Sequence, residues 1–64
     1  MIGKNIREIR KKRCLSQSEL AKMIGTSQAA ISKYEKEEQD PTFKTLQKIA
    51  QALGVPLSVL VRDC

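Results

Sequence analysis

The chain has 64 residues, which suffice for one small domain and leave little room for a catalytic cleft. Hydrophobic residues make up 41% of it and charged residues 30%, with a net charge of +5, so we expect a folded protein rather than a disordered one. No run approaches the roughly 18 apolar residues of a membrane span, and the N-terminus lacks the apolar stretch of a secretory signal. We therefore expect a cytoplasmic protein.

The positive charge is concentrated at the N-terminus. Residues 1–15 hold six basic side chains against Glu8 alone, whereas the basic and acidic side chains of residues 16–64 cancel. A basic stripe favours a polyanion as partner, because each phosphate that it neutralises releases counterions. A solvated helix face is the other interpretation, and it stays open for any single residue. The six side chains are Lys4, Arg7, Arg10, Lys11, Lys12 and Arg13.

The apolar spacing predicts a helix over residues 3–12. Ile2, Ile6 and Ile9 recur at i, i+4 and i+7, which is the period of an amphipathic helix. Arg10 follows on the same side.

A second helix is expected over residues 17–24. Ser16 and Glu19 match the S-x-x-E capping box, in which a hydroxyl and a carboxylate satisfy backbone amides at a helix start. Leu20 and Ile24 form one apolar stripe, and Gly25 can take the positive φ that ends such a helix.

The third helix is expected over residues 28–36, with Ser27 as its N-cap. Its apolar side is Ala30, Ile31 and Tyr34, which leaves a short polar face elsewhere on the helix. The short connection between the second and third helices predicts a helix-turn-helix, in which the small side chain of Ala21 lets the two helices approach.

Two further helices complete an all-α architecture. Thr42 can cap a helix over residues 43–53 that ends at Gly54, and Pro56 suits the first turn of a short helix over residues 56–61. The expected apolar positions of these helices are Phe43, Leu46, Ile49, Ala50, Leu53, Leu57, Leu60 and Val61. No linker or repeat divides the chain, so we expect residues 1–64 to form one five-helix bundle.

Composition also argues against metal and enzyme chemistry. The chain has no histidine, and two cysteines fifty residues apart cannot complete a four-ligand zinc site. No base is placed beside Cys14 or a serine to activate it. We expect no cofactor, no metal, no disulfide with Cys64 and no enzymatic activity.

The whole pattern resembles the xenobiotic-response-element type of helix-turn-helix, the fold of phage repressor and Cro proteins, restriction-modification controllers and many antitoxins. Cys14 and Glu37 stand where relatives commonly have glycine, so the first and third helices must end by another route or accept a strained residue. Glu37 and Glu38 also make contacts from that loop to phosphate unfavourable. The residues that carry the resemblance are Gln17, Leu20, Ala21, Gly25, Ile31, Tyr34, Pro41, Leu46, Ile49, Ala50, Leu53 and Gly54.

The resemblance implies that the third helix reads double-stranded DNA in the major groove. The implied base contacts are Gln28, Ala29, Ser32 and Lys33. Gln28 can bond an adenine edge, Lys33 can donate to guanine, and Ala29 can touch a thymine methyl group. The alternative for each is an ordinary solvated position.

Backbone contacts are implied for Gln17, Ser27, Lys36 and Arg10. For Lys36 a purely local interaction with the helix C-terminus is the alternative. The family also pairs the arginine at position 10 with the glutamate at position 35. An Arg10–Glu35 ion pair and a phosphate contact from Arg10 can hold together.

The expected function is therefore that of a sequence-specific transcriptional regulator, most simply a repressor that binds a two-fold symmetric operator as a homodimer. Leu57 and Val61 are the candidate subunit contacts, with closure of the monomer core as the alternative. A second possibility is an antitoxin-like module that neutralises a toxin and binds its own operator. No small-molecule ligand and no membrane partner is indicated.

Overall fold

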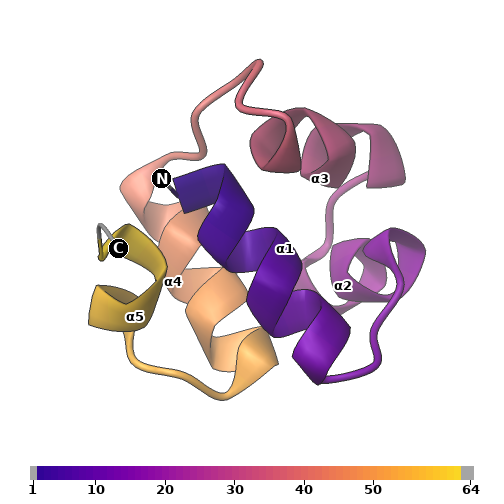
Figure 1. The fold of residues 1–64 in the computed structure, drawn as a ribbon. Coiled ribbons are helices and arrows are strands. Elements are labelled where there is room, and N and C mark those ends of the chain that lie inside the picture. The colour runs from indigo at the N-terminus through magenta and orange to yellow at the C-terminus, as the bar shows by residue number, and fades with distance from the viewer. Residues whose placement is uncertain (1, 63–64) are drawn as a thin grey trace.

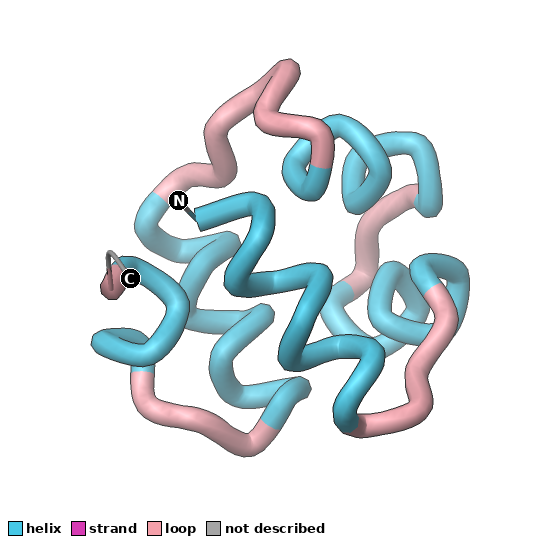
Figure 2. The backbone as a smooth tube through the Cα atoms, in the orientation of Figure 1, coloured by secondary structure: helices cyan, strands magenta, loops and turns pink. Residues whose placement is uncertain are grey.

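The computed structural model describes residues 2–62, and within that range it contains five helices and no strand. Figure 1 shows α1 running alongside α4, with α5 on one side and α2 and α3 on the other, and Figure 2 shows the loops that join them. No helix in residues 2–62 has the length and hydropathy to cross a membrane. The helices are α1 Ile2–Lys12, α2 Gln17–Ile24, α3 Gln28–Glu35, α4 Phe43–Leu53 and α5 Leu57–Val61.

The helix starts confirm the expected capping residues. The Ser16 hydroxyl accepts a hydrogen bond from the Glu19 amide at 3.0 Å, and the Glu19 carboxylate accepts one from the Ser16 amide at 2.9 Å. The hydroxyls of Ser27 and Thr42 accept bonds from amides three residues on, at 3.2 Å in each case. These bonds satisfy amides that have no partner within the helix.

Three helix boundaries differ from the sequence expectation by one residue. α1 already begins at Ile2, and α3 ends at Glu35 because Lys36 serves as its C-cap. Pro56 is the N-cap of α5 rather than its first helical residue, since its ψ of 149° is extended.

α1 and α3 end as glycine-terminated helices do, although the residues in the left-handed region are Cys14 with φ of 58° and Glu37 with φ of 61°. After α1, the Leu15 amide donates to the Arg10 carbonyl at 3.1 Å, which is the long bond of a Schellman motif. The Glu38 amide makes the matching bond to the Lys33 carbonyl at 2.9 Å. α1 and α3 therefore end by accepting a strained residue. Cys14 and Glu37 each bear left-handed strain of about 1–2 kcal/mol.

All five helices contribute to one hydrophobic core. The largest fully buried side chains are Ile6, Leu20, Ile31, Ile49, Leu53 and Leu60. The structure corrects the expectation for Phe43. The apolar spacing places Phe43 on the buried side of α4, whereas the residue is 64% exposed. It is the first residue of α4, and the buried stripe of that helix begins one turn later at Leu46.

Candidate nucleic-acid interface

The turn between α2 and α3 brings the two helices close together. Gly25 takes φ of 74° as predicted, and the Thr26 amide closes the turn on the Ala21 carbonyl at 2.9 Å. Ala21 is only 2% exposed, whereas a larger side chain there would force the helices apart. The pair has the form of a helix-turn-helix, with α3 as its second helix.

α3 buries one side and exposes another. Ile31 is fully buried, while Gln28, Ala29 and Lys33 are exposed and Ser32 is half-buried. Ser27, at the start of the helix, uses its hydroxyl oxygen to accept the Ala30 amide, which leaves the hydroxyl proton for a further acceptor. The exposed face is short and polar, and it begins at the first turn of the helix.

Arg10 and Glu35 form an ion pair between α1 and α3. Arg10 Nε donates to Glu35 Oε2 at 2.6 Å, and Arg10 Nη2 donates to Glu35 Oε1 at 3.0 Å. Only 10% of the arginine side chain and 3% of the glutamate side chain remain exposed. The hydrogen bond that Arg10 donates to the Glu35 carboxylate raises the pKa of Arg10 above its usual value, so the guanidinium stays charged despite its burial.

Arg10 makes one more hydrogen bond within the protein. Its third nitrogen, Nη1, donates to the Leu15 carbonyl at 2.8 Å, so all three guanidinium nitrogens bond within the protein. The residue as a whole is 8% exposed. Arg10 also lines a surface hollow beside Lys36, so its expected contact with a phosphate stays a prediction beside the ion pair.

Gln17 also contacts this pair. Its Nε2 donates to Glu35 Oε1 at 3.1 Å, so residues from α1, α2 and α3 meet at one carboxylate. The sequence suggested only a phosphate contact for Gln17. The amide nitrogen of its side chain also bonds inside the protein, which fixes the start of α2 against α3, and the phosphate contact stays a prediction.

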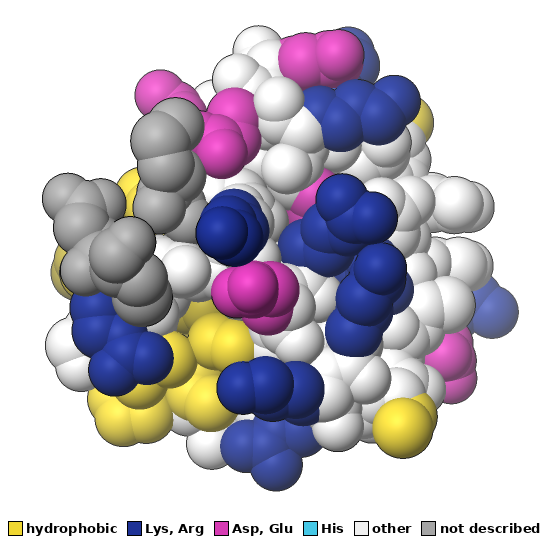
Figure 3. All heavy atoms as spheres, viewed as in Figure 1, with side chains coloured by type: hydrophobic (Ala, Val, Ile, Leu, Met, Phe, Trp, Pro, Cys, Tyr) yellow, Lys and Arg dark blue, Asp and Glu magenta, His cyan; other side chains and the backbone are white. Residues whose placement is uncertain are grey.

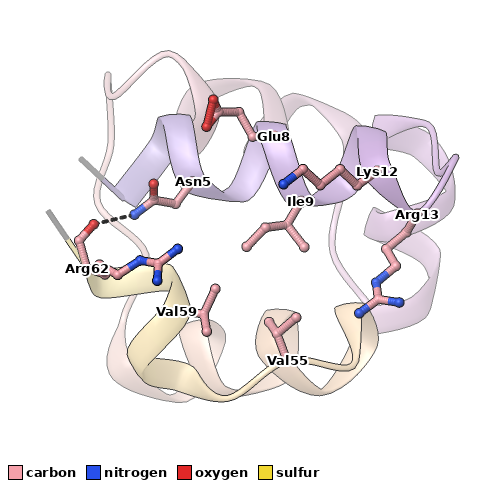
Figure 4. A pocket seen from close by; sticks show the side chains of 8 residues that line it. All are labelled: Asn5, Glu8, Ile9, Lys12, Arg13, Val55, Val59 and Arg62. Carbon is pink, nitrogen blue, oxygen red and sulfur yellow. Dashed lines mark hydrogen bonds between the residues drawn. The ribbon is translucent and has the colours of Figure 1, made fainter. Parts of the chain in front are cut away.

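Sequence reasoning missed two residues that position α1. Asn5 is 8% exposed. Its Nδ2 donates to the Leu60 carbonyl at 2.9 Å and to the Arg62 carbonyl at 2.7 Å. Figure 4 shows the hydrogen bond to Arg62. Gly3 lies against the end of α3, where an added Cβ would approach the Tyr34 carbonyl oxygen to 2.4 Å. An asparagine and a glycine inside a helix were the available signals, because both are poor helix formers.

Most of the basic side chains of α1, together with Arg13 just after it, line one of two hollows on the surface. Lys and Arg side chains lie over α1 and beside α2 and α3 in Figure 3. One hollow, of about 250 Å³, is lined by Arg7, Arg10, Lys11, Gln17, Glu35 and Lys36. The other, of about 380 Å³, has an apolar floor next to α5 (Figure 4), and its lining is Asn5, Glu8, Ile9, Lys12, Arg13, Val55, Val59 and Arg62.

The chain belongs to the helix-turn-helix family, whose pattern matches residues 6–60. It is 40% identical over 63 residues to the cryptic phage CTXphi transcriptional repressor RstR of Vibrio cholerae, and the match covers 98% of this chain and 57% of RstR. It is 44% identical over 52 residues to antitoxin HigA1 of Mycobacterium tuberculosis, covering 80% of this chain and 35% of HigA1. The chain thus spans about half the length of these relatives or less.

A solved structure agrees with the family assignment. The P22 c2 repressor protein, in complex with a synthetic operator, superposes with a TM-score of 0.88 at 37% identity, covering 94% of this chain and 91% of that one. The expected fold class, a phage-repressor-like five-helix bundle, is confirmed.

Proposed function

We propose that this chain is a sequence-specific double-stranded DNA-binding transcriptional regulator of the cytoplasm, and that it acts as a repressor by occupying an operator. The observation that carries the proposal is the exposed polar face at the start of α3, held against α2 by a tight turn. Helices presented in this way fit the major groove, where each base pair offers a distinct set of donors and acceptors. The similarity to RstR and to the P22 c2 repressor supports the same function.

The proposed base contacts come from the first two turns of α3. Gln28 would bond an adenine edge, Ala29 would touch a thymine methyl group, and Lys33 would donate to guanine. Ser32 is half-buried and would contribute one hydroxyl at the edge of this face.

The proposed backbone contacts flank that face. The free hydroxyl proton of Ser27 and the ammonium of Lys36, which is exposed directly after α3, would each donate to a phosphate. Gln17 would contribute the amide of its main chain, because its side-chain nitrogen is already bonded to Glu35. These contacts would set the register of the protein without selecting bases.

A homodimer would give the protein its reach along DNA. A single helix-turn-helix reads a few base pairs, and a two-fold pair would bind half-sites about 34 Å apart. Val61 is 47% exposed and Phe43 is 64% exposed, and both lie where the end of α5 approaches the start of α4 (Figure 1). We propose that Val61, supported by the half-buried Leu57, contributes to the subunit contact.

Selection of bound sites from random DNA at moderate salt tests this proposal, and a two-fold symmetric motif is the expected result. Gln28→Ala should then weaken binding to the selected site by about 1–3 kcal/mol at one base position and leave other positions unaffected. Gln47→Ala is the matched control, since Gln47 is an exposed glutamine on α4. No enriched motif would refute the proposed function, and equal weakening on all sequences would make Gln28 a backbone contact.

An antitoxin-like function is the second candidate, and the similarity to HigA1 is the observation that favours it. A chain of this kind would neutralise a small toxin and also bind its own operator. Co-purification with a second small protein, and relief of that protein's toxicity by this chain, would support this second function. RstR matches over nearly the whole of this chain, and we therefore place the repressor first.

A further inference from the structure

We propose that the groove between α1 and α5 binds an acidic amphipathic helix of a partner protein. The groove is the hollow of about 380 Å³ described above, and its lining comes from α1, α5 and the loop residues next to them. Figure 1 shows α5 and α3 on opposite sides of α1. A helix bound in the groove would therefore leave α3 uncovered, and the proposal does not depend on DNA binding.

The groove follows α1 for about two turns. Asn5, Ile9 and Lys12 line it at i, i+4 and i+7, which places them on one face of the helix. At 1.5 Å per residue these positions span about 10 Å. Val59 of α5 forms the opposite wall (Figure 4). The groove thus has the length of a two-turn helical segment, and an amphipathic helix with its apolar face in a groove is a recurrent mode of peptide recognition.

The floor of the groove is apolar and recessed. Ile9 and Val55 are half-buried and pack against the hydrophobic core, and Val59 is half-buried beside them. An inserted leucine or phenylalanine side chain would be removed from water there, which favours binding. A side chain that projects from a partner can reach such a floor, whereas the flat surface of a membrane cannot. The recessed floor therefore favours a protein segment over a lipid surface.

The charges around the floor determine the sign of the partner. Figure 4 shows Arg62 at one end of the groove and Lys12 and Arg13 at the other end. Glu8 also lines the groove, but in Figure 4 its carboxylate points away from Val59. The rim is thus positive at both ends. A helix with carboxylates on both sides of its apolar side chains would complement this arrangement, whereas a ligand with a single anionic end would leave one end of the groove unpaired.

Selection from a phage-displayed library of random peptides, each of about 16 residues, tests the proposal. The library is selected on the 64-residue chain at 150 mM salt, where a Debye length of about 8 Å suppresses long-range attraction. We expect the selected peptides to combine aspartate or glutamate with leucine, isoleucine or phenylalanine at i and i+4. A library without any selected peptide, or with selected peptides that lack acidic residues, would refute the proposal.

Two double variants then provide a matched comparison. K12Q/R13Q and R7Q/K11Q each remove two exposed positive charges from the same part of the chain, but only the first pair lines the groove. The affinity of a selected, fluorescently labelled peptide should fall about 3- to 10-fold for K12Q/R13Q, as expected for the loss of two surface ion pairs, and less than about twofold for R7Q/K11Q. Equal losses would show general attraction to a basic protein and overturn the proposal. Circular dichroism melting checks that both variants fold.

Amide chemical shifts of the isotopically labelled chain locate the bound peptide. We expect the largest changes at Ile9, Val55 and Val59, and changes confined to another face would contradict the proposal. Phosphatidylserine vesicles should leave these amides unchanged, and vesicle binding at the groove would assign it to a membrane instead. Changes at the same amides on concentrating the chain alone would make the groove an interface between two copies. These measurements use no DNA, so their failure leaves the proposed function standing.

Discussion

Replacement of Glu35 by alanine should cost this domain much of its stability. The Glu35 carboxylate accepts bonds from Arg10 Nε, Arg10 Nη2 and Gln17 Nε2, at 2.6, 3.0 and 3.1 Å. Without it, a guanidinium whose side chain is 10% exposed has no counter-charge. Removing one partner of a buried pair costs about 3–5 kcal/mol. A domain of this length has roughly 3–10 kcal/mol in total, so Glu35→Ala should lose roughly a third of that stability or more.

Urea unfolding followed by circular dichroism measures this destabilisation. Glu38→Ala is the control, because Glu38 is an exposed acid three residues on, and its effect should stay within about 0.5 kcal/mol. The double variant Arg10→Met with Glu35→Leu should recover most of the stability, since replacing both charges leaves no unpaired buried ion. A destabilisation below about 0.5 kcal/mol for Glu35→Ala would refute the argument that the pair joins α1 to α3.

Three further substitutions test local features of the fold. Gly3→Ala should lower the free energy of unfolding by about 1–3 kcal/mol despite alanine's helix propensity, because its Cβ would lie 2.4 Å from the Tyr34 carbonyl oxygen; a more stable variant in urea would contradict this. Cys14→Gly should raise the free energy of unfolding by about 0.5–1 kcal/mol, since glycine takes the φ of 58° without strain, and an unchanged urea midpoint would count against it. Hydrogen bonds from the amide and hydroxyl of Ser16 lower the pKa of Glu19. The contribution of the Glu19 carboxylate to folding stability is therefore complete above the ordinary glutamate pKa of about 4.3, and it is lost as the pH falls through the lower pKa of the folded state. The stability difference between wild type and Glu19→Ala should therefore shrink on acidification, and a difference independent of pH would argue against this role.

The helices could be predicted because their signals are local. The bonds of the capping box join Ser16 and Glu19, which are three residues apart, and the positive φ of Gly25 needs only the absence of a side chain. The periodic apolar residues then indicate which side of each helix is buried. Phe43 shows the limit of that argument, since periodicity places it on the apolar side of α4 and does not show where the neighbouring helices stop.

The candidate reading face follows from the same local signals, since α3 begins where Ser27 caps it and exposes Gln28, Ala29 and Lys33. Their base contacts remain predictions. The sequence also showed that the positive charge lies on α1, but it did not show that the charge is divided between two surfaces. That division depends on where α3 and α5 pack against α1.

Local signals in the amino-acid sequence by themselves thus determined the five helices, the turn between α2 and α3, and the polar face of α3. Only the tertiary structure decided which distant groups meet. Arg10 and Glu35 are 25 residues apart, and Asn5 donates to a carbonyl 57 residues away. These two contacts hold α1 in its place in the fold. Such contacts depend on the packing angles of whole helices, which no short window of sequence encodes. The same packing buries Arg10 and leaves Arg7 and Lys11 exposed beside α3, although all three are basic residues of one helix.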